Sequence, residues 1–285
     1  MTKNLYIHCD GGFGNRFNAL VVGLNICERG EFIPVISWPS TNVCRAFYDD
    51  IFEPKFLFTT NRLEEYSKNL DKFEFVLHEN QLFWEIKYSS PYYFYSIDQI
   101  VSHYKNSEKN NLFYYNNLIP NYSDLDLSLI SKISFKKEYH NIVNKFLKYE
   151  DYIGVHLRST DFPQGTINFD EIYNRIENSE KVHFVCSDSL DIENKFRELN
   201  NVFTFPKKSY VSKINSSLDW RVSKGSIVDE KNKALSFNVE RDVQSVKEAI
   251  IDLLILSKSD IMLTSNSTFL TTAKLLKSFY YDSSI

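Results

Sequence analysis

Residues 152–161 read Tyr-Ile-Gly-Val-His-Leu-Arg-Ser-Thr-Asp. The first half of this stretch is a short apolar run of the kind that forms a buried strand. His156, Arg158 and Asp161 then follow within six positions. Ligands of open α/β sheets bind at the carboxyl edge of the strands, so we expect these polar groups to lie there. Arg158 is the strongest candidate, because a guanidinium suits planar, bidentate recognition of a phosphate or carboxylate.

Strand and helix patterns alternate on both sides of this stretch. Apolar runs predict strands at residues 5–9, 32–38, 152–157, 182–186, 202–205 and 260–264. Helical spacing predicts helices at residues 17–29, 125–147, 169–176, 191–199, 242–256 and 269–279. Residues 206–241 are polar and predict a long loop. The sequence therefore indicates an α/β protein, which we divide at the polar segment 148–151 into domains of residues 1–150 and 151–285.

Polar residues follow three of the strands in the second domain. Asp188 follows the strand at 182–186, and Ser265 follows the strand at 260–264. In a parallel sheet these ends share an edge with Arg158, so their side chains should converge. Each has a structural alternative: a core histidine for His156, helix caps for Asp188 and Ser265, and a turn residue for Asp161. Their coincidence favours a ligand with phosphate and hydroxyl groups, such as a nucleotide.

A glycine-rich turn and a charged residue inside an apolar helix are two further candidate features of a binding site. Residues 11–16 read Gly-Gly-Phe-Gly-Asn-Arg between the first strand and its helix, where backbone amides can face an anion or a sugar hydroxyl. The pattern differs from the dinucleotide motif Gly-x-Gly-x-x-Gly, and a simple tight turn is the alternative. Asp252 lies in the most apolar part of the predicted helix at 242–256, and a buried carboxylate requires a partner.

Composition narrows the classes of function. The 285 residues carry 33 basic and 37 acidic side chains, a net charge of −4 that argues against a general nucleic-acid binder. The four cysteines show no Cys-x-x-Cys pair and no metal-ligand spacing, which favours reduced thiols and a cytoplasmic location. The N-terminus has no signal-peptide pattern, and no apolar run reaches the length of a membrane span. We therefore expect a soluble cytoplasmic protein.

Four motifs, in order, resemble those of the GDP-fucose-dependent fucosyltransferases. This superfamily includes nodulation fucosyltransferase, α-1,2- and α-1,6-fucosyltransferases and protein O-fucosyltransferases. His-x-Arg-x-x-Asp at 156–161 resembles the first signature, and Phe-Val-Cys-Ser-Asp at 184–188 resembles the second. Asp252 with Ser-Asn-Ser-Thr-Phe at 265–269 is similar to the third, and residues 11–15 are similar to the N-terminal glycine motif. Residues 36–54 also resemble the nodulation enzyme.

The resemblance implies a GT-B glycosyltransferase, in which two Rossmann-like domains face each other across a cleft. Residues 1–150 would form the acceptor side and residues 151–285 the nucleotide-sugar side, with the last helix able to pack back on the first domain. The implied reaction is inverting, metal-independent transfer of L-fucose from GDP-fucose to a glycan acceptor. The implied setting is assembly of a bacterial surface polysaccharide or lipopolysaccharide. It involves no cofactor, nucleic-acid partner or membrane span, although peripheral association with a lipid-linked acceptor is compatible.

Roles for individual residues follow from the same resemblance. Arg158 would bind the donor pyrophosphate, and His156 would shape the donor site. Asp188 and Asp252 would bind the guanosine end or order the pocket, and Ser267 would contact a donor phosphate. The other implied donor contacts are Gly12, Gly14, Asn15, Arg16, Ser265, Asn266 and Thr268. The carboxylate candidates for the general base are Asp161 and Asp10.

Ser159 departs from the family pattern, because many relatives carry a second arginine directly after the first. The candidate replacements are Arg16, Arg221, Lys224 and Arg241. The departure leaves two alternatives open. One is a GT-B transferase that uses another donor, such as GDP-heptose or another deoxyhexose. The other is a non-catalytic sugar- or nucleotide-binding homologue.

Overall fold

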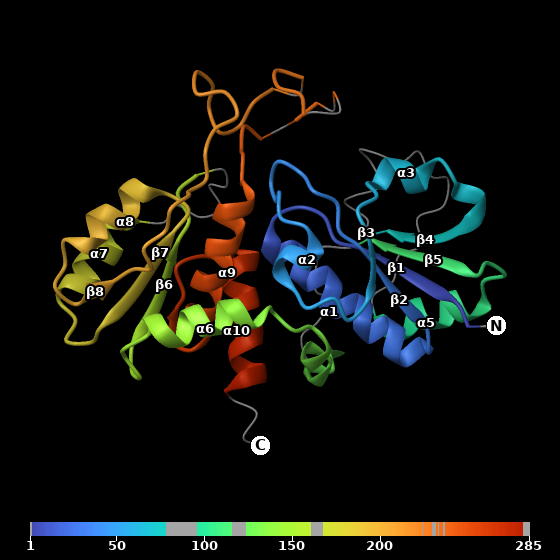
Figure 1. Ribbon diagram of the computed structural model, residues 1–285, viewed down its shortest axis with the longest axis horizontal. Coiled ribbons are helices and arrows are strands. Elements are labelled where there is room, and N and C mark those ends of the chain that lie inside the picture. The colour runs from blue at the N-terminus through green and yellow to red at the C-terminus, as the bar shows by residue number, and fades with distance from the viewer. Residues whose placement is uncertain are drawn as a thin grey trace. The chain divides into compact units, whose positions relative to one another are not determined.

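The computed structural model describes residues 2–77, 96–115, 124–160, 168–223, 225–229, 232, 234–235 and 237–281. Its chain forms two compact units (Figure 1): Met1–Ser40 with Phe47–Ser134, and Thr41–Ala46 with Phe135–Ile285. The division thus falls before the boundary expected at residue 150. The reason is α6 (Lys137–Phe146), which buries Tyr139 and Val143 and packs against α9 (Val243–Ser257) of the second unit.

The first unit contains a five-stranded parallel sheet in the order β3-β2-β1-β5-β4. Its strands are β1 (Asn4–His8), β2 (Ile33–Ser37), β3 (Leu57–Thr59), β4 (Phe73–Leu77) and β5 (Asn111–Tyr115). Its α-helices are α1 (Phe13–Gly30), α2 (Tyr48–Ile51), α3 (Leu63–Ser67) and α5 (Ile97–Asn106), with 3-10 helices η1 (Leu70–Lys72) and η3 (Leu127–Lys132). The opening βαβ unit is confirmed, whereas the helix predicted at 125–147 is η3 and α6 separated by a bend.

Helix α1 approaches the sheet closely because a glycine lies at the contact. A Cβ added to Gly23 would lie 2.5 Å from the side chain of Ile7 on β1. The helix ends where Glu31 adopts a left-handed conformation with φ 59°, and its N–H closes the last turn. These local features fix the position of the glycine loop at the other end of α1.

The second unit contains a four-stranded parallel sheet in the order β8-β7-β6-β9. Its strands are β6 (Ile153–Leu157), β7 (His183–Ser187), β8 (Val202–Phe203) and β9 (Asp260–Met262). Its remaining helices are α7 (Phe169–Glu177), α8 (Leu190–Arg197) and α10 (Thr268–Tyr280). Figure 1 shows α7 and α8 on one face of the sheet and α9 and α10 on the other. The strands and helices predicted for residues 152–285 are all found, with ends shifted by a few residues.

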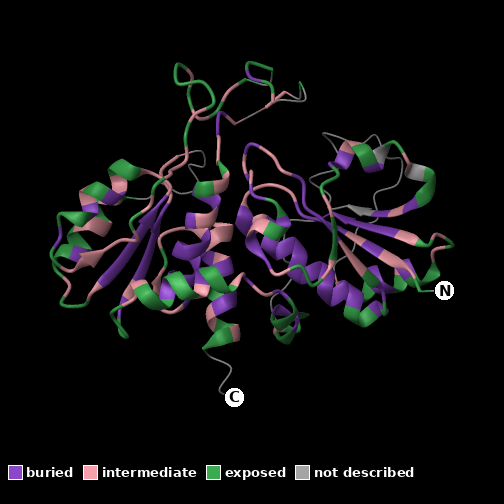
Figure 2. Cartoon of the chain, in the orientation of Figure 1, coloured by how far each residue is buried: buried purple, intermediate pink, exposed green. Residues whose placement is uncertain are grey.

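Both faces of β6 are buried, which explains its continuous apolar sequence (Figure 2). Val155 and Leu157 pack in one core cluster with Ile176 of α7 and Phe196 of α8. On the opposite face, a Cβ added to Gly154 would lie 2.1 Å from the Ser259 hydroxyl. Glycine is therefore needed where the end of α9 crosses the strand.

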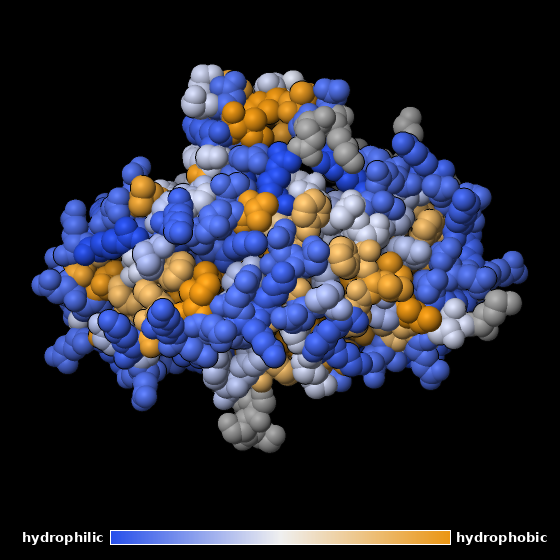
Figure 3. Space-filling model, in the orientation of Figure 1, coloured by the Kyte–Doolittle hydropathy of each residue, from blue (hydrophilic) through white to orange (hydrophobic). Residues whose placement is uncertain are grey.

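Residues 206–241, hereafter the arm, form no helix or extended strand among their described positions. Isolated antiparallel bridges instead join Ser212 to Glu240, Arg221 to Phe237 and Val228 to Ala234. Figure 3 shows apolar side chains gathered on the arm, whose exposed large apolar residues include Ile214 and Val228. The predicted loop is thus a structured loop of the second unit, in which bridges pair its outgoing and returning segments.

All four cysteines are buried as free thiols. No helix in the described parts of the chain is both long and apolar enough to cross a membrane.

Candidate functional site

The carboxyl ends of β7, β6 and β9 lie side by side, because β6 pairs in parallel with both neighbours. Leu157 is in register with Ser187, and Val155 with Met262. Two hydrogen bonds join the segments that follow: Ser159 N–H donates to Asp188 at 2.8 Å, and the Thr264 hydroxyl donates to the His156 carbonyl at 2.5 Å. The three strand ends expected at one edge therefore lie together, whereas convergence of the Arg158 and Ser265 side chains stays a prediction.

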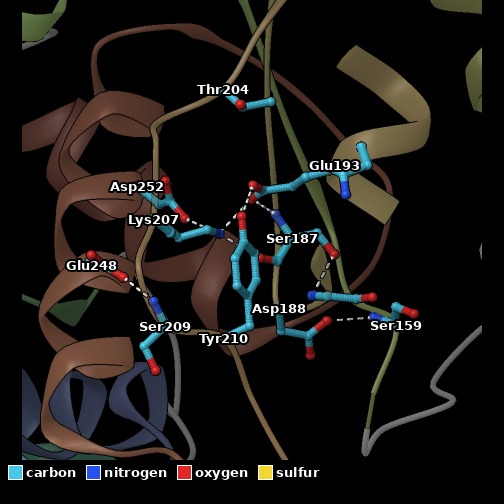
Figure 4. Close-up of polar contacts among 12 residues, drawn as sticks. Ser159, Ser187, Asp188, Glu193, Thr204, Lys207, Ser209, Tyr210, Glu248 and Asp252 are labelled. Carbon is cyan, nitrogen blue, oxygen red and sulfur yellow. Dashed lines mark hydrogen bonds and ion pairs between the residues drawn. The ribbon is translucent and has the colours of Figure 1, made fainter. Parts of the chain in front are cut away.

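Asp188 holds the chain directly after Arg158. Its Oδ1 accepts the Ser159 N–H, and its Oδ2 accepts the Thr160 hydroxyl at 2.5 Å. Figure 4 shows Asp188 reaching across to Ser159. Ser189 occupies the N-cap position of α8, and it makes no side-chain cap. The helix-cap alternative for Asp188 is therefore wrong; its carboxylate fixes the loop that carries Arg158.

His156 is buried, with 7% of its surface exposed, and its ring lies 4.7 Å from that of Phe269. Burial, reinforced by the positive charges of Arg158 and Lys207, lowers the pKa of His156 to about 3. The imidazole is consequently neutral at physiological pH. Its Nδ1 has no hydrogen-bond partner among the described residues.

The segment after β9 leads into the N-terminus of α10. Ser267 is the N-cap, and its hydroxyl accepts the Leu270 N–H at 3.2 Å. The cap is thus Ser267, not Ser265 as the structural alternative had it. Ser265 Oγ is buried without a partner in the described part of the chain, whereas Asn266 is exposed. Thr268 is the first residue of the helix.

Asp252 of α9 has the partner that its burial requires, and that partner is Lys207 at the root of the arm. Lys207 Nζ lies 2.8 Å from Asp252 Oδ2 and 2.5 Å from Glu193 Oε1 of α8. It also donates to the Ser187 carbonyl at 2.6 Å. Figure 4 shows this ammonium between the two carboxylates. Lys207 and Glu193 were not predicted as site residues, because nothing in the polar run around Lys207 indicates a contact with Asp252, 45 positions away.

The charges in this cluster are unequal, since two carboxylates share one ammonium. Burial alone would lower the pKa of Lys207, but Asp252 and Glu193 outweigh it and raise that pKa above its ordinary value. Burial raises the pKa of Asp252 to about 7; Lys207 opposes this increase, and Glu193 adds to it. The ammonium therefore remains charged, while Asp252 gains a proton far more readily than an exposed aspartate.

In the first unit, Arg16 supports the glycine loop from within. Its side chain is fully buried, donates to the carbonyls of Gly11 and Pro39 at 2.7 Å each, and lies 5.1 Å from the Trp38 ring. We therefore correct the expected role of Arg16 from donor contact, or replacement arginine, to loop support. Gly11 has a φ of 80°, a conformation that favours glycine.

The other predicted residues of this loop differ in how accessible they are to a ligand. Gly12 is the N-cap of α1, with open space where a Cβ would be, and Gly14 and Asn15 lie in the first helical turn. Asp10 accepts the Gly11 N–H at 2.6 Å and lies 3.7 Å from the Arg16 guanidinium. With 26% of its side chain exposed, the Asp10 carboxylate stays a candidate base.

Some predicted residues are not clarified by this geometry. Asp161 and Lys224 lie outside the described residues. Arg221 is exposed on the arm, with its guanidinium 6.0 Å from the Phe237 ring. Among the described residues, no group of three or more His, Cys, Asp and Glu side chains is arranged to hold a metal ion. Metal independence itself stays a prediction.

Comparison with known proteins gives structural matches alone. No protein-family model matches the sequence, and no curated protein matches it. NodZ α-1,6-fucosyltransferase co-crystallised with GDP is 15% identical, with a TM-score of 0.58 over 97% of this chain and 93% of that chain. This chain therefore shares the fold of NodZ.

Other solved structures agree with this fold. Selenomethionine NodZ from Bradyrhizobium is 15% identical, with a TM-score of 0.60 over 97% of this chain and 92% of that chain. POFUT1 in complex with GDP-fucose is 13% identical, with a TM-score of 0.50 over 98% and 96% of the two chains. A mutant of Arabidopsis thaliana FUT1 in complex with GDP is 10% identical, with a TM-score of 0.55 over 97% and 68%. These structures thus share a fold with this chain over nearly its whole length.

Proposed function

We propose that this chain is an inverting, metal-independent glycosyltransferase that moves L-fucose from GDP-fucose to a glycan acceptor. The observation that carries the proposal is the fold similarity to GDP-bound NodZ, which spans 97% of this chain and 93% of that one. We further propose a GT-B arrangement, in which the second unit binds the donor and the first unit the acceptor.

Arg158 is the proposed anchor of the donor pyrophosphate. In the reaction, an acceptor hydroxyl oxygen forms a bond to the fucose anomeric carbon while the bond from that carbon to the phosphate oxygen breaks. The leaving GDP gains negative charge, which a guanidinium at the pyrophosphate stabilises without a metal ion. The Asp188 clip supports this role, because it holds the backbone immediately after Arg158.

Three buried polar atoms support donor binding at the same strand edge. His156 Nδ1, Asp252 Oδ1 and Ser265 Oγ have no hydrogen-bond partner among the described residues. Buried polar groups without partners are costly, and a nucleotide supplies donors and acceptors. We assign Asp252 to the guanosine end and His156 to shaping the donor site. We assign Ser267 to a phosphate, because its hydroxyl accepts from Leu270 and still has a proton to donate.

Asp10 and Asp161 are the proposed candidates for the base that removes the acceptor proton. The proposed biological setting is bacterial surface polysaccharide or lipopolysaccharide assembly in the cytoplasm, with a possible lipid-linked acceptor at the membrane surface. Ser159 favours one second candidate function: transfer from a different GDP-sugar. Its N–H is used by Asp188, and its side chain offers no second cation.

A panel of GDP-sugars tests the proposal, with calorimetric GDP binding measured alongside. We expect GDP-fucose turnover, and a kcat/KM about 100-fold lower in Arg158→Ala, the size typical for loss of a charge-stabilising donor. Arg175→Ala, an exposed arginine of α7, is the matched control and should retain full activity. Turnover of another GDP-sugar instead would select the second candidate. GDP binding without any turnover would support a non-catalytic homologue, and absence of GDP affinity would overturn the proposal.

A further inference from the structure

The Lys207 ammonium uses all three of its hydrogens on oxygen atoms from three different elements. Its side chain is 5% exposed, and it contacts the Ser187 carbonyl of β7, Glu193 of α8 and Asp252 of α9 at 2.6, 2.5 and 2.8 Å. An ammonium has three N–H donors and no acceptor, so this set of contacts saturates it. The position of Lys207 is therefore defined from three directions.

The Ser187 peptide is held on both sides by this cluster. Its carbonyl accepts from Lys207, and its N–H donates to Glu193 Oε1 at 2.9 Å. Ser187 immediately precedes Asp188, whose carboxylate fixes Ser159 and Thr160. A continuous series of short contacts thus runs from Lys207 to the residue after Arg158.

The same cluster anchors the start of the arm. Tyr210 donates to Glu193 Oε2 at 2.7 Å, and the backbone N–H groups of Lys208 and Ser209 donate to Glu248 of α9 at 2.9 Å. Lys207 therefore joins the arm, two helices and the strand edge at one point.

Stability alone is a weak explanation for such an arrangement. Replacing a buried ion cluster with apolar residues of similar size is often neutral or stabilising, because desolvation offsets the Coulomb attraction. The cluster instead supplies directional contacts, which an apolar core does not. We infer that Lys207 is a positioning residue of the donor site, which acts through Ser187 and Asp188 on the placement of Arg158. The inference rests on the proposed donor site.

Loss of the ammonium has a specific electrostatic consequence. In Lys207→Met, Glu193 and Asp252 remain buried, with Arg197 as a cation 3.2 Å from Glu193 Oε2. The two carboxylates repel each other at high pH, whereas protonation of one relieves the repulsion at low pH. The variant should therefore bind GDP more weakly as pH rises.

The other groups around the cluster do not produce this response. Burial keeps His156 neutral and raises the pKa of the Cys186 thiol, so neither changes charge between pH 6 and 8. Arg158 also faces this region, because its positive charge acts on His156. Glu248 accepts from the arm backbone, Asp188 accepts from the β6 loop, and Tyr210 has a pKa raised to about 12.

The test compares full-length wild type, Lys207→Met and Lys195→Met by GDP calorimetry at pH 6 and pH 8. Lys195 is the matched control, because it is an α8 lysine whose side chain is 42% exposed and which pairs with Asp170 at 2.8 Å. We expect GDP affinity to fall about 10-fold at pH 8 in Lys207→Met and less at pH 6, with no change in Lys195→Met. The double variant Lys207→Met/Glu193→Gln has one buried carboxylate fewer, and it replaces Lys207→Met in the experiment if that variant does not fold. It should bind GDP weakly with a smaller pH dependence.

A second readout separates this inference from the proposed function. Amide hydrogen exchange at Ser159 and Asp188 in ligand-free protein should be faster in the Lys207 variants than in Lys195→Met. If wild type has no GDP affinity, the proposed function fails, and exchange still decides whether Lys207 holds the loop. Unchanged exchange together with wild-type GDP affinity at both pH values would overturn the inference.

Discussion

His156 and Asp252 are both buried, and burial shifts their pKa values in opposite directions. As a result, their contributions to stability change in opposite directions with pH. The pKa of His156 falls from 6.5 to about 3, because the protonated ring is disfavoured inside the protein. The pKa of Asp252 rises from 3.8 to about 7, because its charged form is disfavoured there. Each group therefore prefers to be neutral in the folded state, and each gives a different pH dependence.

His156 binds a proton below pH 6.5 in the unfolded chain, but only below about pH 3 in the folded chain. Its contribution to stability is thus present above pH 6.5 and lost as pH falls toward 3. His156→Gln should show a shallower loss of unfolding free energy on acidification, by at most about 1.4 kcal/mol per pH unit. Urea unfolding at pH 4, 5, 6 and 7 measures this slope. An unchanged slope would contradict the buried, neutral assignment.

For Asp252 the sign is reversed, because the folded chain holds a proton that the unfolded chain releases above pH 3.8. Its contribution is present below pH 3.8 and lost as pH rises through about 7. Asp252→Asn should therefore lose less stability than wild type between pH 4 and 7 in the same urea series. Asp191→Asn, at an exposed position of α8, is the control and should follow wild type. Identical slopes in the two variants would refute the prediction.

At the scale of the elements, the turn between β7 and α8 acts as a clip for the turn after β6. Asp188 provides both acceptors of this clip, at 2.8 Å from Ser159 N and 2.5 Å from the Thr160 hydroxyl. Hydrogen bonds to a charged group are stronger than neutral ones, so their loss affects the loop more than the helix.

Asp188→Ala should lower the unfolding free energy by about 1–3 kcal/mol. At a temperature where the variant is fully folded, its kcat/KM should still be lower than that of the wild type, because the loop that carries Arg158 is no longer fixed. Asp191→Ala is the control, since it removes a carboxylate from the first turn of the same helix without touching the β6 loop. Activity and chemical denaturation are measured on both. Equal activity in the two variants would show that the clip is dispensable.

The sequence was sufficient for the elements whose burial is periodic or continuous. β6, β7 and α9 are mostly buried and rich in apolar residues, and the alternation of strands with helices favours parallel pairing, so Arg158 and Asp188 were expected at one edge. Long-range polar contacts had no such signal. Lys207 lies in a lysine- and serine-rich segment that resembles any solvated loop, and Arg16 resembles a ligand contact until its burial is seen. For Asp252, the apolar surroundings predicted that a partner was needed, but the sequence did not show that this partner is Lys207.

At the scale of the whole molecule, the division into units depends on contacts between distant parts of the sequence. Thr41–Ala46 belongs to the second unit because Arg45 pairs with Glu240 at 2.7 Å and Asn42 donates to the Val239 carbonyl at 2.9 Å. These partners are more than 190 positions apart, with separations of 195 and 197. No local composition marks such a return of the chain, which explains why a polar segment near residue 150 suggested a simpler boundary.

Assignment of the donor to the second unit makes a prediction about where GDP acts in the full chain. A ligand that binds the folded state stabilises the segments it touches and their surroundings. Amide exchange with and without GDP should therefore slow most in peptides that cover residues 156–160, 186–189 and 263–268. The loop at residues 10–16, which carries the implied donor contacts Gly12, Gly14 and Asn15, should slow less, because it belongs to the first unit and Arg16 is satisfied within it. Arg158→Ala should abolish the slowing, whereas Arg175→Ala should preserve it. Protection centred on residues 10–16 would move the donor to the first unit and reverse the proposed roles of the two units.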